Sequence, residues 1–204
     1  MSAPAFLHQV TVAITGASGT LYGLKILELL RARGDTEVHL VVSPSGWLTL
    51  SSETDLGREA VEAKAHVVHS PKAVGNCIAS GSYPSKGMII APCSMHTLAG
   101  VALGLSDNLI TRAADVCLKE RRRLVILPRE TPLNLAHLRN MVSVTEMGGI
   151  VMPPVPALYQ RPQSIDELVT HTAQHAIELL NLPPVASPAG QAGVELNRPQ
   201  WNGL

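Results

Sequence analysis

Aromatic side chains are scarce in this chain, whose 204 residues include two Trp, three Tyr and one Phe. A buried core must therefore be built from aliphatic side chains, which suits a parallel sheet covered by helices. The 16 basic and 16 acidic residues cancel, so a general affinity for nucleic acid or for anionic lipid is not indicated. No apolar run is long enough to cross a bilayer, so no membrane span is predicted.

Cysteine is also rare, and its spacing is uninformative. Cys77, Cys93 and Cys117 are an odd number without C-x-x-C spacing, which disfavours a disulfide framework and a structural zinc site. Reduced thiols and the lack of a secretory pattern in the first nine residues predict a cytoplasmic protein. Cys93 precedes a predicted helix, where a lowered pKa could make it a nucleophile, but a small buried hydrophobic residue is favoured.

Histidine gives no metal motif. His171 and His175 lie four residues apart, a spacing that can hold a metal, but no acid or third ligand is evident near them. We therefore predict no metal site.

Apolar runs alternate with amphipathic segments along the chain. The predicted strands are 10–15, 38–43, 65–69, 87–92, 123–128 and 149–152, and the predicted helices are 20–33, 45–52, 95–105, 108–120, 134–146 and 164–180. This order predicts one α/β domain over residues 1–180, with a Rossmann-like (flavodoxin-like), doubly wound parallel sheet. The Pro-, Ala- and Gly-rich residues 181–204 are predicted to form an irregular tail that reaches a neighbouring subunit.

The segment from Val12 to Gly23 joins an apolar strand to a helix through a glycine-rich turn. Such a turn binds phosphate, because its backbone N–H groups and the positive end of the helix dipole point at the ligand. The glycines are spaced G-x-x-G-x-x-x-G, unlike the dinucleotide pattern G-x-G-x-x-G. The next predicted strand ends in Ser43, where a nicotinamide-binding unit usually has an acid. A mononucleotide site is therefore predicted.

Ligands of doubly wound sheets bind beyond the carboxyl ends of the strands, so the loops there are the candidate site. Ser18 is expected to contact a ligand, although capping the helix is an alternative. Ser94, in the loop 92–97, suits helix capping and ligand binding equally. Arg129 and Glu130 follow another strand, where a carboxylate can serve as a general acid or base. Their position favours this functional interpretation over a salt bridge.

Arg112, Asp115 and Lys119 lie on one stripe of a predicted helix. From the residues alone, we favour two intrahelical ion pairs on a solvated face, each contributing only about a few tenths of a kcal/mol.

Taken together, these segments resemble the UbiX-like flavin prenyltransferase family from about residue 10 to residue 180. The matching segments come in family order and at family spacing: 15–19 (TGASG), 52–55 (SETD), 79–82 (ASGS), 92–94 (PCS), 112–116 (RAADV), 118–122 (LKERR), 128–133 (PRETPL) and 153–159 (PPVPALY). The resemblance implies a Rossmann-like fold, bound FMN and a homododecamer with sites between subunits.

The resemblance also implies an activity. The chain would transfer the dimethylallyl group of dimethylallyl monophosphate to N5 and C6 of reduced FMN, without a metal, and pass prenylated FMN to a UbiD-like decarboxylase. The implied FMN contacts are Gly16, Ala17, Ser18, Ser43, Ser94, Met95, His96, Thr97 and Arg129. Arg112, Lys119 and Tyr159 would hold the prenyl phosphate, while Ser18 and Glu130 would carry protons.

One position departs from the family. Close relatives have Arg or Lys on the last helix, sixteen residues after the tyrosine, where this chain has His175. A protonated His175 is expected to substitute as a phosphate ligand, or phosphate binding is weaker or altered. In the tail, Arg198 and Trp201 resemble the Arg-Trp ending of some members.

Two alternatives remain open. One is an FMN-dependent cysteine decarboxylase of related fold, whose catalytic histidine and P-x-M-N motif are not evident here. The other is a non-catalytic FMN-binding partner subunit. Only the presence of Ser18, Lys119 and Glu130 argues against it.

Overall fold

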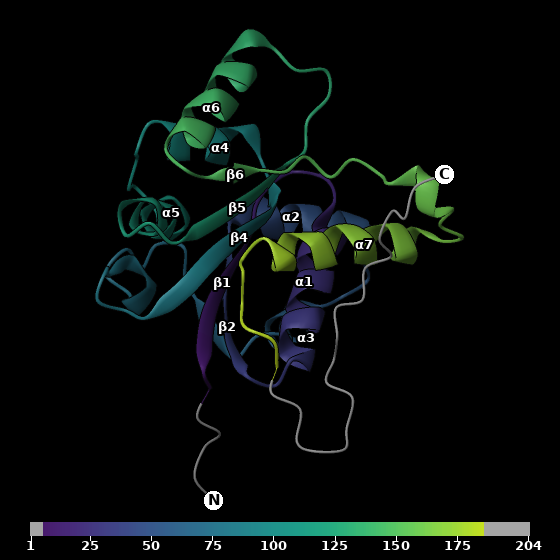
Figure 1. Cartoon of the computed structure of the whole chain (residues 1–204), viewed down its shortest axis with the longest axis horizontal. Helices are drawn as coiled ribbons and strands as arrows, with labels where there is room; N and C mark the ends of the chain where they lie inside the picture. The colour runs from purple at the N-terminus through teal and green to yellow at the C-terminus, as the bar shows by residue number, and fades with distance from the viewer. Residues whose placement is uncertain (1–5, 186–204) are drawn as a thin grey trace, which may run out of the picture.

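A parallel six-stranded sheet forms the centre of the part of the chain that the computed structural model describes, residues 6–185 (Figure 1). The strands are β1 (His8–Ile14), β2 (Thr36–Val42), β3 (Val67–His69), β4 (Ser85–Cys93), β5 (Arg123–Pro128) and β6 (Ile150–Val151). Their order in the sheet is β3-β2-β1-β4-β5-β6, so the winding direction reverses between β1 and β4. The predicted doubly wound Rossmann-like sheet is confirmed, with all pairs parallel.

The helices follow the predicted order. They are α1 (Thr20–Ala32), α2 (Pro44–Glu53), α3 (Arg58–Glu62), α4 (Met95–Ala102), α5 (Leu109–Lys119), α6 (Leu135–Glu146) and α7 (Ile165–Glu178), with short 3-10 turns η1 (Cys77–Ala79) and η2 (Leu158–Gln160). Each predicted helix is present, although α4 ends at Ala102 where the pattern predicted residue 105. The sequence did not predict α3, η1 and η2, because segments of three to five residues are too short to show periodicity.

Two aliphatic cores lie on the two faces of the sheet. On β1, Val10, Val12 and Ile14 point to the core shared with α1 and α7, whereas Ala13 points to the core beneath α4 and α5. Figure 1 shows α7 crossing α1 on the first face. Full burial of an aliphatic side chain contributes about 1.5–3 kcal/mol. The sheet can therefore be built without aromatic residues, as their scarcity indicated.

Gly23 lets α1 approach the sheet closely. A Cβ atom at this position would lie 2.3 Å from the carbonyl oxygen of Ala91 on β4 and 2.8 Å from Cγ1 of Ile14 on β1. The third glycine of the turn therefore serves helix packing on the two central strands, which fixes the start of α1 above their carboxyl ends.

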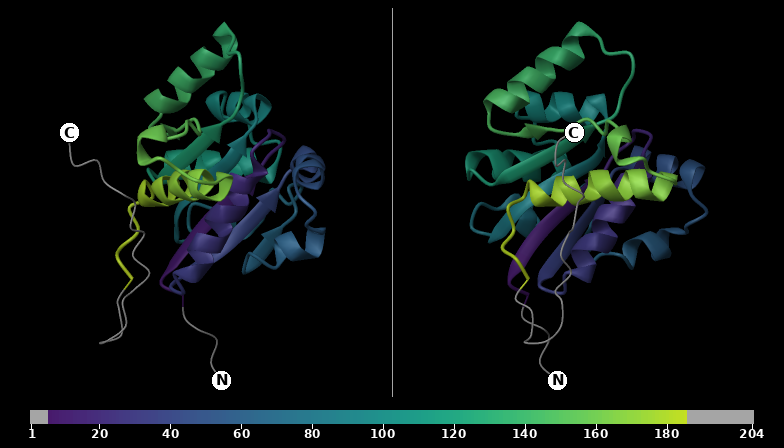
Figure 2. Two further views of the ribbon diagram at one scale, coloured as in Figure 1. Left: turned by 90° about the vertical axis from the view of Figure 1, so that its right-hand side faces the viewer. Right: turned by 45° about the vertical axis from the view of Figure 1, so that its right-hand side comes forward.

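Helix α6 stands at one end of the molecule, at the top of both views in Figure 2. Among the described residues, no helix combines the length and the apolar character needed to cross a membrane. Of the predicted tail, residues 186–204 lie outside the described residues, and Arg198 and Trp201 are among them. The last described residues contact the domain through Arg33, whose guanidinium donates a 2.8 Å hydrogen bond to the carbonyl of Pro183.

Candidate functional site

The loops that follow β1, β2 and β4 converge where the winding of the sheet reverses. A loop between each strand and the next helix leaves the carboxyl end of its strand, and ligands of doubly wound sheets bind at this crevice. The three loops carry Gly16–Gly19, Ser43 and Ser94. The fold therefore brings together the segments that the sequence singled out separately.

Thr15 joins two of these loops. Its hydroxyl donates a 2.9 Å hydrogen bond to the carbonyl of Pro92 and accepts a 2.8 Å hydrogen bond from the backbone N–H of Ser94. The side chain is 1% exposed, so neither bond competes with water. Sequence reasoning gave Thr15 no role, because its partners are 77 and 79 residues away.

A cavity of about 280 Å³ lies between the loops. It is lined by Gly16, Ser43, Pro44, Ser45, Pro71, Ser94, His96, Thr97, Asn108 and Ile110. Gly16 lies directly against the loop after β2, since a Cβ atom there would be 2.4 Å from Cβ of Ser45. Four predicted FMN ligands with polar side chains thus border one cavity: Ser43, Ser94, His96 and Thr97.

Two helices begin at this cavity. The hydroxyl of Ser43 accepts a 2.9 Å hydrogen bond from the N–H of Gly46 at the start of α2, and Ser94 accepts one of 3.3 Å from the N–H of Thr97 on α4. Both serines therefore cap helices and also line the cavity. Helix N-termini attract anions, so the cavity offers two of them to a negatively charged ligand.

The N-terminus of α1, in contrast, is occupied by a carboxylate of the same chain. Glu53, at the end of α2, accepts hydrogen bonds from the backbone N–H groups of Gly19 at 2.9 Å and Thr20 at 2.8 Å, and from the Thr20 hydroxyl at 2.7 Å. The glycine turn was expected to bind phosphate through its backbone N–H groups, but these two N–H groups bind the Glu53 carboxylate instead. A ligand would meet the turn at residues 16–18.

Ser18 is held by the same carboxylate. Burial raises the pKa of Glu53, but hydrogen bonds from the side chains of Ser18 and Thr20 and from the backbone outweigh it, so the pKa lies below its ordinary value. Ser18 therefore hydrogen-bonds an ionised carboxylate, and the N-cap position of α1 belongs to Gly19. The segment 52–55 resembled the family, but sequence reasoning assigned Glu53 no role.

Ser18 and Arg129 line a second cavity of about 270 Å³. Tyr22 borders it as well: burial raises the pKa of its phenol, and the positive charge of Arg129 partly opposes the rise. A cavity of about 520 Å³ with apolar and charged lining residues adjoins, sharing Leu21, Ile165 and Val169 with the second one and reaching Glu53. Volumes of this order suit a small organic ligand.

The remaining predicted flavin-side residues lie close by. Ala17 continues the glycine turn, with its N–H bonded to the carbonyl of Thr15 at 2.8 Å, and Met95 packs against the core beneath α4 and α5. Glu130 is exposed, and its carboxylate accepts a 3.0 Å hydrogen bond from the N–H of Thr131. The structure shows no salt bridge for Glu130 within the described residues.

The cations of α5 are paired locally. Arg112 bonds Asp115 at 2.9 Å, as the helical spacing predicted. Lys119 instead bonds the neighbouring Glu120, so the second predicted pair has a different partner. Both side chains of each pair are partly exposed, which leaves them accessible to an anion.

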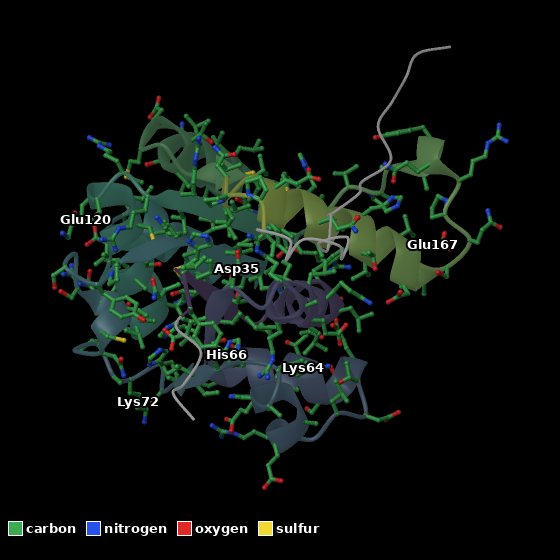
Figure 3. All side chains as sticks on the ribbon, turned by 60° about the horizontal axis from the view of Figure 1, so that its bottom comes forward. Asp35, Lys64, His66, Lys72, Glu120 and Glu167 are labelled. Carbon is green, nitrogen blue, oxygen red and sulfur yellow. The ribbon has the colours of Figure 1, made fainter. Side chains whose placement is uncertain are left out.

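The predicted phosphate ligands do not meet within one chain. His175 lies on α7, which packs on α1, while Arg112 and Lys119 lie on α5 across the sheet. Figure 3 shows Glu120, next to Lys119, and Glu167, on α7, on opposite sides of the molecule. His175 Nδ1 lies 3.3 Å from Glu178 Oε2, and Tyr159 is 57% exposed in η2 just before α7.

Cys93 is fully buried, and burial raises the pKa of its thiol well above the ordinary value. This confirms the hydrophobic interpretation over the nucleophilic one.

Comparisons with known proteins agree with this arrangement. The family model described as Flavoprotein matches residues 5–177. A flavin prenyltransferase UbiX of Neisseria meningitidis serogroup B is 56% identical over 176 residues, covering 86% of this chain and 93% of that protein. The structure of AnUbiX (PadA1) in complex with FMN and dimethylallyl pyrophosphate has a TM-score of 0.87 at 41% identity, covering 97% of this chain and 98% of that one. A dodecameric FMN-dependent UbiX-like decarboxylase from Escherichia coli O157:H7 has a TM-score of 0.86 at 39% identity, covering 96% of this chain and 100% of that one.

Proposed function

Because the chain belongs to the UbiX flavin prenyltransferases of the flavoprotein family, we propose that it attaches a dimethylallyl group to reduced FMN. The donor is dimethylallyl monophosphate, the acceptor atoms are N5 and C6, and the product is prenylated FMN. The observation that carries the proposal is the convergence of three strand-end loops on one crevice, with Ser18 and Arg129 both lining a second cavity.

The donor set of this crevice fits a flavin mononucleotide. Hydroxyls of Ser43, Ser94 and Thr97 and the first turns of α2 and α4 suit a phosphate, because charge-assisted hydrogen bonds to an anion are strong. The guanidinium of Arg129 suits a polar ring edge. When bound, reduced FMN supplies the electron-rich atoms that the allylic carbon requires.

The chain's own residues would handle the charge and the protons. Departure of the phosphate leaves negative charge on oxygen, which the fixed cations Arg112 and Lys119 and the phenol of Tyr159 would stabilise. His175 would add a fourth contact. Ser18, which hydrogen-bonds the ionised Glu53, and Glu130, which is exposed and follows Arg129, would exchange protons with the ring or the phosphate.

The phosphate site requires more than one subunit. The sheet separates α5, with Arg112 and Lys119, from α7, with His175, so a site that uses all three side chains needs a second copy of the chain. Helix α6 offers an apolar stripe for assembly, since Leu135, Leu138 and Val142 are 60%, 46% and 57% exposed. The dodecameric relative supports a homododecamer. We place the enzyme in the cytoplasm, where it passes its product to a UbiD-like decarboxylase.

Mass spectrometry of the flavin tests this function directly. The purified protein is incubated with FMN, a reductant and dimethylallyl monophosphate, and the flavin is expected to gain the mass of one isoprene unit. A protein that binds FMN but leaves its mass unchanged would be a non-catalytic flavin-binding subunit. Release of carbon dioxide from a peptidyl cysteine, in the absence of a prenyl donor, would instead indicate a cysteine decarboxylase.

A further inference from the structure

Three metal-ligating side chains meet where β2, β3 and η1 come together, and none of them lines the cavities described above. Nδ1 of His39, Nε2 of His69 and Sγ of Cys77 all lie within 4.8 Å of one another. We propose that these three residues bind a divalent transition metal ion, zinc above all, at a site separate from the flavin crevice. This inference goes beyond the proposed function and does not depend on it.

The sheet register builds the cluster. His39 pairs with Val67 and Val41 pairs with His69, so the two histidines alternate onto the same face of the sheet. After β3 the chain returns in η1 and places Cys77 over this face. His39 and His69 are 2% and 6% exposed, whereas Cys77 is exposed. An ion can therefore enter from solvent past the sulfur and reach two buried nitrogens.

The surroundings of His39 resemble those of a metal ligand. Its Nε2 lies 2.9 Å from the Tyr83 hydroxyl and 3.2 Å from Oε2 of Glu37, and the hydroxyl donates to the same carboxylate at 3.2 Å. A metal-bound histidine characteristically donates its second ring N–H to a carboxylate or a similar acceptor. With the proton on Nε2, the lone pair of Nδ1 points at His69 and Cys77.

Two imidazole nitrogens and one thiolate fit tetrahedral zinc with a water as the fourth ligand. The two nitrogens are 2.8 Å apart and the rings are stacked at an interplanar angle of 7°. Zinc–nitrogen bonds of about 2.0–2.1 Å in a tetrahedron set the nitrogens about 3.3 Å apart, so the rings must separate by about 0.5 Å and each turn by about 35° for both lone pairs to meet at the ion. Without a metal, the same contact is a hydrogen bond between two buried histidines.

The experiment uses the full chain, treated with a chelator and then titrated with Zn²⁺ by calorimetry and with Co²⁺ by absorption spectroscopy. We expect one ion per chain, tetrahedral cobalt bands and a thiolate-to-cobalt charge-transfer band. Cys77→Ser, at an exposed position, should lose that band and weaken zinc binding at least about tenfold. Glu37→Gln keeps all three ligands and should weaken binding by about 10- to 100-fold. His66→Gln is the matched control, because a side-chain oxygen can still accept the hydrogen bond from Val38, and should change nothing.

The proposal is overturned if the wild-type chain does not bind zinc, if Cys77→Ser binds it equally well, or if cobalt gives an octahedral spectrum without the charge-transfer band. FMN binding is measured on the same samples and is expected to be the same with and without zinc. Loss of FMN binding in every sample would refute the proposed function while leaving the metal site intact, so the two failures can be told apart.

Discussion

The carboxylate of Glu53 should be the strongest single contributor to the stability of the glycine turn. It accepts hydrogen bonds from two backbone N–H groups and from the hydroxyls of Ser18 and Thr20 at the start of α1, where the helix dipole also favours a negative charge. We propose the substitution Glu53→Gln, which keeps the size of the side chain and removes its charge. Glu62→Gln is the matched control, because Glu62 pairs with Arg58 at 2.7 Å on the surface.

The magnitude follows from the lost contacts. A hydrogen bond to a charged group contributes about 1.5–3 kcal/mol, and loss of a helix cap costs about 1 kcal/mol. Glutamine still offers one acceptor oxygen, and the site is only partly buried, so we expect Glu53→Gln to lower the free energy of unfolding by about 1–2 kcal/mol. For a domain of this size, each kcal/mol lowers Tm by about 2–4 °C. The surface pair of the control should contribute less than about 0.5 kcal/mol.

The effect should depend on pH with a definite sign. Because the pKa of Glu53 is lower in the folded protein than in the unfolded chain, the unfolded chain binds more protons as the pH falls. The stabilisation is complete above the unfolded value, near pH 4.3, and is lost as the pH falls through the lower folded pKa. Wild type and Glu53→Gln should therefore differ most at pH 7 and converge in acid.

Urea unfolding of the wild type, Glu53→Gln and Glu62→Gln at pH 7 and at a series of acidic pH values measures these differences. The reasoning is refuted if Glu53→Gln is as stable as the control at pH 7. It is also refuted if the destabilisation stays constant into acid, since the effect would then arise from packing and not from the charge.

The alternation of strands and helices could be predicted from the sequence because its signal is local. The run Val38–Val42 and the amphipathic residues of α5 each show their period within a dozen residues, and both elements lie where the pattern placed them. Elements without a period, such as α3 with five residues, could not be found this way. The position of the crevice could also be predicted from the sequence, because the order of the strands and the handedness of the crossovers fix which loops meet.

Contacts between distant segments could not be predicted from residue spacing. Glu53 reaches Gly19 across 34 residues, and His39 reaches His69 across 30, so neither pair has a signature in the sequence. Such pairs form only when the register of a strand or the length of a loop is fixed by the whole fold. The roles of Arg112 and His175 have a different origin: they come from the family resemblance, and in one chain the sheet keeps them apart, so they stay predictions.

Three further predictions address the reaction. Glu130→Gln should bind FMN as the wild type does and turn over about two to four orders of magnitude more slowly, because it loses a proton carrier and not a binding contact; calorimetry and the mass of the product measure both, and an unchanged rate would assign Glu130 a structural role. Arg112→Ala and Lys119→Ala should raise the concentration of dimethylallyl monophosphate required for half-maximal rate at least about tenfold while FMN affinity is unchanged. The exposed Lys86→Ala, near the amino end of β4, is their control, and equal kinetic constants in all three would show that the α5 cations do not face the phosphate. His175→Arg should tighten prenyl phosphate binding by about 1 kcal/mol, the value of a charge-assisted hydrogen bond, because a guanidinium carries a permanent charge. Calorimetry on the wild type and the variant measures this difference, and equal affinities would show that His175 does not contact the phosphate.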